Sequence, residues 1–388
     1  MALPVMITLA VMAFAWPAGR ISPRDVPVGI VGTGPAGQHA VEGLTRAKPG
    51  AFDFHLYPDR QAVRSAIENR EVYGAFAISG RGITVLKATA ASPSVAQLLT
   101  DVGHQLADKA NQQIARQKAA AHPPAKARKQ AAARPGAGQQ KAAGPAATGA
   151  DSSAKILVKA VDVVPLAAED PRGVVFSSSV FPLTICGILI GAFVTTARTL
   201  ARARNQVLTL LVACAVAALG VYLVAQGFLG ALPHDHVATW AILSLFLISI
   251  SATAAGVVRL LGPAGLGLSA ALMVFVGNAC SGATSAPEML PEGAGYVGQL
   301  LPPGAGASLL RETTYFDGNA GAGHLAVLAL WSVCGLTAVM CGHRVTGAAR
   351  GAKTSATREL LPASPGPGAA SPIPHHTHAH ARRHDGDG

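Results

Sequence analysis

The sequence predicts an α-helical polytopic membrane protein of about six transmembrane helices, with an external α/β domain inserted between the first helix and the second. Three observations support this fold class. The 388 residues are 50% hydrophobic and only 13% charged, a balance too apolar for a soluble domain of this size. Nearly all charged residues lie in 20–172, in short connections or after residue 343. Residues 27–90 alternate short strand-like and helix-like stretches, as a small α/β unit does.

The first element is a short apolar run, residues 3–16. A bilayer core about 30 Å thick needs about 20 apolar residues in a helix, so this run is shorter than a complete span. The alternative is the hydrophobic region of a signal peptide, but no basic residues precede the run and no clear A-x-A site follows it. We therefore predict a retained first span over residues 1–17, and whether this span is complete or truncated at its N-terminal end stays open.

The second element is a domain over residues 18–178. Its strand-like stretches read "VPVGIVG", "FDFHLY", "VYGAFAI" and "ITVLKAT", with helical stretches between the first three. An amphipathic helix is predicted over 93–117, and a further strand over 155–166. Residues 118–153 contain almost no large apolar side chain, so this segment is predicted to be a disordered insertion.

The third element is a membrane domain over residues 179–343. Its five apolar runs are 180–197, 207–229, 237–258, 264–286 and 324–341. Short loops rich in Lys and Arg face the cytoplasm, which places the connection 198–205 and the tail 344–388 inside. The loop 233–236 has no Lys or Arg, and 287–323 carries four acidic residues against one arginine, so both are predicted outside. This topology puts both termini in the cytoplasm and residues 18–178 outside the cell membrane.

A glycine pattern follows the first predicted strand. Gly32, Gly34 and Gly37 fit the G-x-G-x-x-G fingerprint of dinucleotide-binding domains. That fingerprint also needs an acidic residue at the end of the second strand, whereas Asp59 follows a proline at the start of the next helix. No second nucleotide-binding half follows. We interpret the glycines as a turn, and predict no cofactor and no enzymatic activity.

The cysteines and a Walker-like sequence predict no metal or nucleotide site. The five cysteines, Cys186, Cys214, Cys280, Cys334 and Cys341, lie in or beside apolar runs and suggest packing rather than a disulfide framework. The sequence "GAARGAKT" at 347–354 resembles a Walker A motif, but Ala352 stands where a glycine must precede Lys353. The histidines in 375–384 follow a proline- and glycine-rich stretch that would not hold their side chains in a fixed arrangement. Whether they bind a metal stays open.

The middles of the predicted spans carry no Asp, Glu, Lys, Arg or His, whereas ion-coupled transporters usually need such residues there. Small residues such as those in "SISATAAG" at 249–256 predict close helix packing. Asn278 brings an amide to the middle of a predicted span, and Ser281 lies near it in the sequence. Movement of a substrate would then need energy from a separate ATPase.

Residues 301–318, "LPPGAGASLLRETTYFDG", precede the last run. Pro302, Pro303 and the glycines are expected to prevent a continuous helix, and the apolar and aromatic residues to form an interfacial face. The segment is predicted to lie on or dip into the outer leaflet. The apolar and aromatic residues of that face are Leu309, Leu310, Tyr315 and Phe316.

Two stretches carry a resemblance. Residues 52–78, "FDFHLYPDRQAVRSAIENREVYGAFAI", with 91–107 after them, and residues 301–318 resemble the type 2 ABC transporter permeases, including phage-infection-protein-like actinobacterial membrane proteins. The resemblance implies an export permease that pairs as a homodimer or heterodimer and depends on a separate cytoplasmic ATP-binding subunit. It also implies that residues 301–318 line an exit or vestibule. The candidate pathway residues are Asn278, Ser281, Leu309, Arg311, Tyr315 and Phe316.

Two other functions remain alternatives. A membrane-anchored external binding or receptor protein would use its helices only as an anchor. A membrane-tethered flavin or nicotinamide enzyme would use the glycine pattern. The transported substrate is not predicted, although uncharged spans are compatible with hydrophobic or amphipathic cargo. Membrane lipids are expected partners, and nucleic acid is not.

Overall fold

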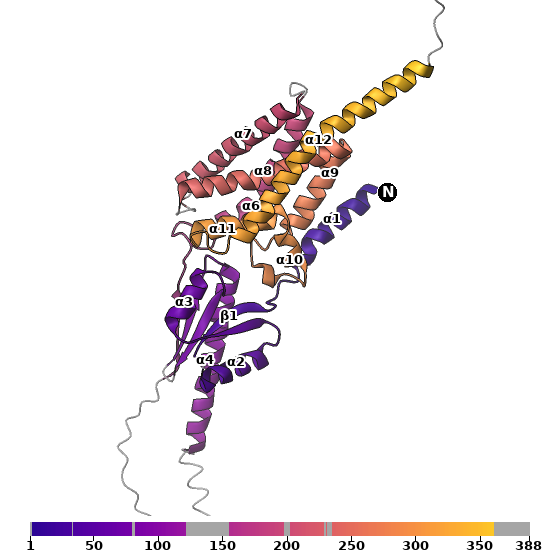
Figure 1. Ribbon diagram of the computed structural model, residues 1–388. Helices are drawn as coiled ribbons and strands as arrows, with labels where there is room; N and C mark the ends of the chain where they lie inside the picture. Colours follow the sequence, from indigo (N-terminus) through magenta and orange to yellow (C-terminus); the bar gives the residue numbers. More distant parts are fainter. Residues whose placement is uncertain are drawn as a thin grey trace, which may run out of the picture. The chain divides into compact units, whose positions relative to one another are not determined.

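The computed structural model describes residues 2–32, 34–79, 82–121, 155–197, 202–228, 230 and 235–360 (Figure 1). These residues form mostly helices, together with one small mixed β-sheet. Four of the helices are long and apolar enough to cross a membrane. The chain divides into two compact units, residues 1–343 and 344–388, and the sheet and all four spans belong to the first. The structure is therefore consistent with a membrane protein, and it shows a small domain built around a mixed sheet.

The sheet contains five strands in the order β2-β1-β3-β4-β5. Strands β3 and β4 pair antiparallel as a hairpin, and all other neighbouring pairs are parallel. Every strand and helix expected in 27–90 is present, and so is the strand after the insertion. The elements of this domain are β1 (Val26–Val31), α2 (Pro35–Ala47), β2 (Phe52–Tyr57), α3 (Arg60–Glu68), β3 (Gly74–Ser79), β4 (Gly82–Lys87), α4 (Pro93–Ala121) and β5 (Leu157–Asp162).

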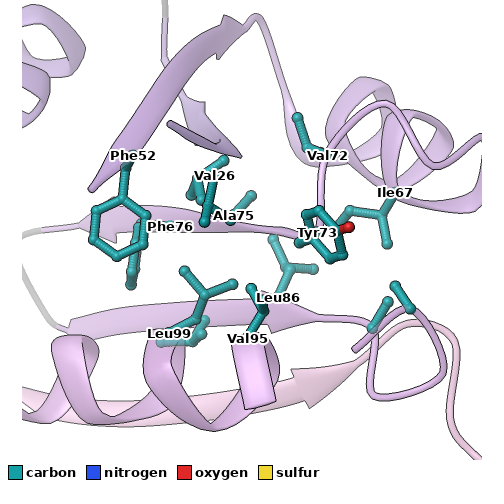
Figure 2. Close-up of a cluster of buried hydrophobic side chains, with 14 of the residues drawn as sticks. Val26, Phe52, Ile67, Val72, Tyr73, Ala75, Phe76, Leu86, Val95 and Leu99 are labelled. Atoms are coloured by element: carbon teal, nitrogen blue, oxygen red, sulfur yellow. The ribbon is translucent and has the colours of Figure 1, made fainter. Parts of the chain in front are cut away.

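Helices cover both faces of the sheet. A Cβ atom added at Gly29 of β1 would lie 2.5 Å from Val63 of α3, so α3 packs closely on one face. On the other face, a Cβ atom at Gly103 of α4 would lie 2.6 Å from Val85 of β4. Figure 2 shows part of the resulting core, with Ile67 on α3 and Val95 and Leu99 on α4. Alternating small and large apolar side chains let the helices approach the strands from both sides.

Helix α4 is longer than the sequence predicts. It runs to Ala121, so residues 118–121 of the expected insertion are helical. The Ala, Lys and Gln residues at this end are good helix formers, and Pro123 and Pro124 follow them. The rest of the expected insertion lies outside the described residues.

Four helices form the apolar core of the second half: α6 (Val174–Thr196), α7 (Ala203–Tyr222, continued by η1, Leu223–Phe228), α8 (His236–Leu261) and α12 (Ala322–Leu360). Helix α8 lies against the other three, and small residues mediate the contacts. A Cβ atom at Gly191 of α6 would lie 2.3 Å from the carbonyl oxygen of Ser251, and one at Gly335 of α12 would lie 2.4 Å from the backbone of Ala252. The packing role predicted for residues 249–256 is confirmed, because all eight are buried.

Two predicted spans are shorter than the bilayer requirement. Helix α1 (Ala2–Ala18) has 17 residues. The run 264–286 forms α9 (Ala264–Ala270) and the π-helical turn η2 (Ala271–Asn278), and the helix ends there. Residues 279–286 instead form turns around Gly282, whose φ of +67° is easy only for glycine. The total of six spans stays a prediction.

The connection before α12 is a packed structure and contains η3 (Pro287–Met289), α10 (Ala294–Gln299) and α11 (Pro302–Tyr315). The expectation that prolines and glycines prevent a continuous helix in 301–318 was wrong. Pro302 and Pro303 occupy the first turn of α11, where a missing N–H costs nothing. Gly306 allows close packing, since a Cβ atom there would lie 2.4 Å from the ring of Phe246 in α8.

Helix α12 extends beyond the predicted start of a disordered tail at residue 344. It ends at Leu360, just before the prolines at 362 and 365. Residues 344–360 contain Ala, Arg, Lys and Glu without proline, a composition that a helix accepts. The histidine tract at 375–384 lies outside the described residues.

Candidate functional site at helix α11

Two adjacent charged residues are buried in α11. Arg311 is 5% exposed and Glu312 is 1% exposed. Burying an ionised side chain costs several kcal/mol unless other groups compensate for the lost water. The partners of these two residues therefore indicate how the surrounding segments are held together.

Glu312 joins three parts of the chain. Its Oε1 accepts a hydrogen bond from Nη1 of Arg70 at 2.6 Å, and its Oε2 lies 3.0 Å from Nδ1 of His324. Arg70 comes directly after α3, and His324 belongs to the first turn of α12. The Arg70 guanidinium also lies over the ring of Phe316, 5.5 Å from its centroid. One buried carboxylate thus links the sheet domain, α11 and a candidate membrane span.

Arg70 reaches this carboxylate from an unusual backbone conformation. Arg70 has a left-handed φ of +59°, and its N–H donates to the carbonyl oxygen of Ile67 at 3.0 Å. A residue with a Cβ atom adopts this conformation at a cost of about 1 kcal/mol. Arg70 pairs with Glu312 from this backbone conformation, directly after the residue that caps the C-terminal end of α3.

Arg311 points away from this network. Its Nη2 donates to the carbonyl oxygen of Ala283 at 2.9 Å, and its guanidinium lies 4.8 Å from the ring centroid of Phe176 at the start of α6. Burial, and then the positive charge of Arg70, lower the pKa of Arg311 to about 10. Arg311 therefore remains positively charged at neutral pH.

Further hydrogen bonds tie the sheet domain to the connection 279–321. The Tyr73 hydroxyl donates to Oε2 of Glu288 at 2.7 Å. Burial, and then the negative charge of Glu288, raise the pKa of Tyr73 well above its usual value. Arg24, between α1 and β1, donates from Nη1 to the carbonyl oxygen of Leu290 at 2.7 Å. Apolar side chains of the connection, including Met289, also join the core of the sheet domain.

Three cavities surround α11. The first, of about 430 Å³, contains Ser308 and Glu312 of α11 together with Arg70, Gln299 and His324. The second, of about 230 Å³, contains Arg311 and Tyr315. The third, of about 640 Å³, contains Leu309 and Thr313 and opens between α8 and α12. Helix α11 therefore presents a different face to each cavity, and the first holds the greatest variety of polar and charged groups.

The six predicted pathway residues do not form one site. Arg311 and Tyr315 share the 230 Å³ cavity, Leu309 lines the 640 Å³ cavity, and Phe316 joins the core of the sheet domain. Asn278 and Ser281 line a separate cavity of about 190 Å³ beside Phe14 of α1, and the Ser281 hydroxyl donates to the Asn278 carbonyl oxygen at 2.8 Å. The Nδ2 of Asn278 is buried and has no hydrogen-bond partner among the described residues.

The expected interfacial face of 301–318 was also wrong. Leu309, Leu310, Tyr315 and Phe316 are each at most 7% exposed, because they pack against other segments of the protein. The sequence reasoning did not select Arg70, Glu312 or His324. The adjacent Arg-Glu pair in "SLLRETTYF" could have indicated this site. Two charges in an apolar, closely packed helix require buried partners.

The glycine pattern makes a tight connection between β1 and α2. Gly32 has a φ of +120°, and a Cβ atom at Gly37 would lie 2.0 Å from the Gly32 carbonyl oxygen. Asp59 caps α3, because its Oδ1 accepts the N–H of Ala62 at 2.8 Å. The positive φ accounts for a glycine at position 32, close backbone contact for Gly37, and helix capping for Asp59.

Within the described ranges, no group of three or more His, Cys, Asp or Glu side chains is arranged to hold a metal ion. All five cysteines are free thiols. Comparison with protein-family models, curated proteins and solved structures finds no match to this chain. The function must therefore be argued from the geometry around α11.

Proposed function

We propose that this chain is the membrane-spanning permease subunit of an ABC-type export system and that it depends on a separate cytoplasmic ATPase. The observation that carries the proposal is the buried contact of Glu312 with Arg70 and His324. It couples the sheet domain to a candidate membrane span through charged groups. A displacement of α12 would therefore be transmitted to the sheet domain.

A simple membrane anchor has no need for such a contact. A domain that is only anchored by a helix can be attached through a flexible linker. A buried ion pair instead costs desolvation free energy and holds the two groups in one geometry. Here Ser22, Arg24, Arg70 and Tyr73 all bond to the connection 279–321 or to its helices. This rigid attachment favours a protein in which the external domain and the helices move together.

The 430 Å³ cavity is the proposed vestibule. Its walls combine charged and polar groups (Arg70, Glu288, Gln299, Glu312 and His324) with apolar ones such as Val72 and Tyr296. Mixed walls of this kind suit an amphipathic cargo. The middles of the described spans carry no Asp, Glu, Lys, Arg or His that could relay ions or protons, so the energy is assigned to the ATPase.

The remaining features of the proposal follow from the resemblance and from the charge distribution. Six spans, both termini in the cytoplasm, residues 18–178 outside the cell and pairing with a second permease belong to it. The type 2 ABC transporter permeases are the proposed family.

Copurification tests the proposal. The full chain is affinity-tagged, solubilised from native membranes, and scored for a companion protein that hydrolyses ATP. A companion at a fixed ratio to the chain is expected. A well-folded chain that never retains such a companion would instead favour the anchored receptor and overturn the permease.

Coupling is tested with a conservative variant. Arg70→Lys keeps the positive charge but loses the planar geometry of the guanidinium. It should lower export of amphipathic compounds several-fold while the ATPase still copurifies. Arg64→Lys is the matched control, since Arg64 makes only a half-exposed surface pair with Glu68 on α3. Equal export by both variants would contradict the proposed coupling.

A further inference from the structure

The 230 Å³ cavity beside α11 has a chemistry of its own. Its lining brings together Arg311, Arg172, Tyr315 and the hydroxyl-bearing side chains of Ser94, Ser177 and Thr284. Among the described lining residues there are two arginines and no carboxylate. The cavity volume is several times the roughly 30 Å³ that one water molecule occupies.

Arg311 brings a positive charge that the described protein does not neutralise by a direct ion pair. No carboxylate oxygen of the described residues lies within ion-pair distance of its guanidinium, and its hydrogen bond goes to the neutral carbonyl of Ala283. The neighbouring Glu312 is engaged by Arg70 and His324 instead. With a pKa of about 10, Arg311 is still protonated at neutral pH.

The acidic group nearby is also engaged. Asp170 is 4% exposed, and its carboxylate accepts the backbone N–H groups of Val174, Val175 and Phe176. It caps α6, so neither its charge nor the N-terminus of α6 is free to serve a ligand. The positive charge in the cavity comes from the two arginine side chains.

We infer that this cavity is a binding site for one phosphate-type oxyanion, held between Arg311 and Arg172. A guanidinium presents parallel N–H donors that match two oxygens of a phosphate group, and arginines are the preferred side chains for this contact. Ser94 and Thr284 line the same space, where the Ser94 hydroxyl donates to the Thr284 carbonyl oxygen at 3.4 Å and is a neutral hydrogen-bonding group for the anion. Arg172 is exposed, so it can close on the anion from the open side.

The cavity lies at the beginning of a candidate membrane span. Val174 and Phe176 line it, and they begin the candidate span α6. Exposed apolar side chains follow on α6, including Phe181, which is 45% exposed. A phosphate group here would lie where a lipid headgroup meets the end of a span, with acyl chains along α6. The anion can therefore come from a phospholipid headgroup or from free phosphate.

The first experiment measures binding of inorganic phosphate, the group that both sources share. The full chain in detergent is titrated with sodium phosphate against sodium chloride at equal ionic strength, and thermal unfolding reports binding. Phosphate should raise the unfolding temperature and chloride should not. In a second arm, nanodiscs of phosphatidylcholine with or without phosphatidylglycerol are compared, and bound lipid is identified by native mass spectrometry.

The variants locate the site. Arg172→Gln should weaken binding about tenfold, the loss expected for a charge-assisted hydrogen bond, and Arg311→Lys should weaken it while keeping the buried charge. Arg46→Gln, on the exposed face of α2, is the control and should bind like the wild type. Because Arg172 is exposed, its variant should fold even if substitutions of Arg311 do not.

Each outcome is informative. Binding of phosphate alone supports a soluble anion, and retention of phosphatidylglycerol supports a headgroup. The inference is overturned if neither probe binds, or if both bind equally well to the wild type and to Arg172→Gln and Arg311→Lys. Binding is measured without transport, so this result is independent of whether the ATPase copurifies.

Discussion

Arg70 and Glu312 are 242 positions apart in the sequence, yet Nη1 of Arg70 lies 2.6 Å from Oε1 of Glu312. The carboxylate is almost inaccessible, and the arginine side chain is 11% exposed. This pair joins the sheet domain to α11.

Breaking the pair should destabilise the protein. Glu312→Gln leaves Arg70 without its counter-charge, and loss of one partner of a buried pair costs about 3 kcal/mol. Arg70→Gln should be costly too, whereas the double variant should lose less than the sum of both. A double-mutant cycle from denaturant unfolding measures this coupling. Strict additivity would show that the two side chains do not interact energetically.

Close packing of α11 on α8 should tolerate no side chain at Gly306. Gly306→Ala places a Cβ atom 2.4 Å from the Phe246 ring, so the free energy of unfolding should fall by about 1–3 kcal/mol. Gly43→Ala in α2 is the matched control, because nothing lies within 4 Å of the added Cβ atom. The control should be neutral or stabilising. Equal effects of the two variants would exclude steric overlap as the cause.

The glycine pattern should behave as a turn. Gly37→Ala should destabilise the sheet domain, because the new Cβ atom would lie 2.0 Å from the Gly32 carbonyl oxygen. Gly34→Ala meets open space and should leave both stability and export largely intact. Thermal unfolding and the visible absorbance of the purified protein are the measurements. A yellow protein that loses its colour and activity in Gly34→Ala would revive the flavin or nicotinamide enzyme.

Stability should fall in alkaline solution through Tyr315. Burial, and then the charge of Asp170, raise its pKa from 10.0 to about 12 in the folded protein. Between these values the unfolded chain releases the phenolic proton while the folded chain retains it, so stability decreases as pH rises. Arg311 acts oppositely, because its pKa is lowered to about 10. Tyr315→Phe should therefore show a smaller loss of unfolding temperature between pH 9 and pH 11. An unchanged profile would contradict the contribution of Tyr315.

The proposed topology should be visible by labelling. Starting from a cysteine-free variant, Arg46→Cys in the exposed face of α2 should react with a membrane-impermeant maleimide in intact cells. Arg204→Cys, at the exposed start of α7 in a connection assigned to the cytoplasm, should react only after the cells are opened. The reverse pattern would invert the orientation and remove the basis for an export permease.

The sequence by itself determined the local elements and the class of protein. Strand-like runs such as 52–57 and the amphipathic pattern from Pro93 identified the sheet domain and its helices, because local hydrophobic periodicity follows from backbone geometry. Four of the predicted spans became continuous apolar helices for the same reason. Small residues at 249–256 correctly indicated close helix packing.

Only the tertiary structure decided the role of residues 301–318. Their prolines and glycines suggested an irregular interfacial segment, but the prolines start α11 and Gly306 fits against Phe246 of α8. The partners of Glu312 come from the turn after α3 and from α12, which the sequence separates by more than two hundred residues. Local composition cannot specify such long-range contacts, because the same apolar residues can pack against lipid or against other parts of the protein. The burial of Glu312 and Arg311 exists only once the sheet domain and the helices have packed around α11.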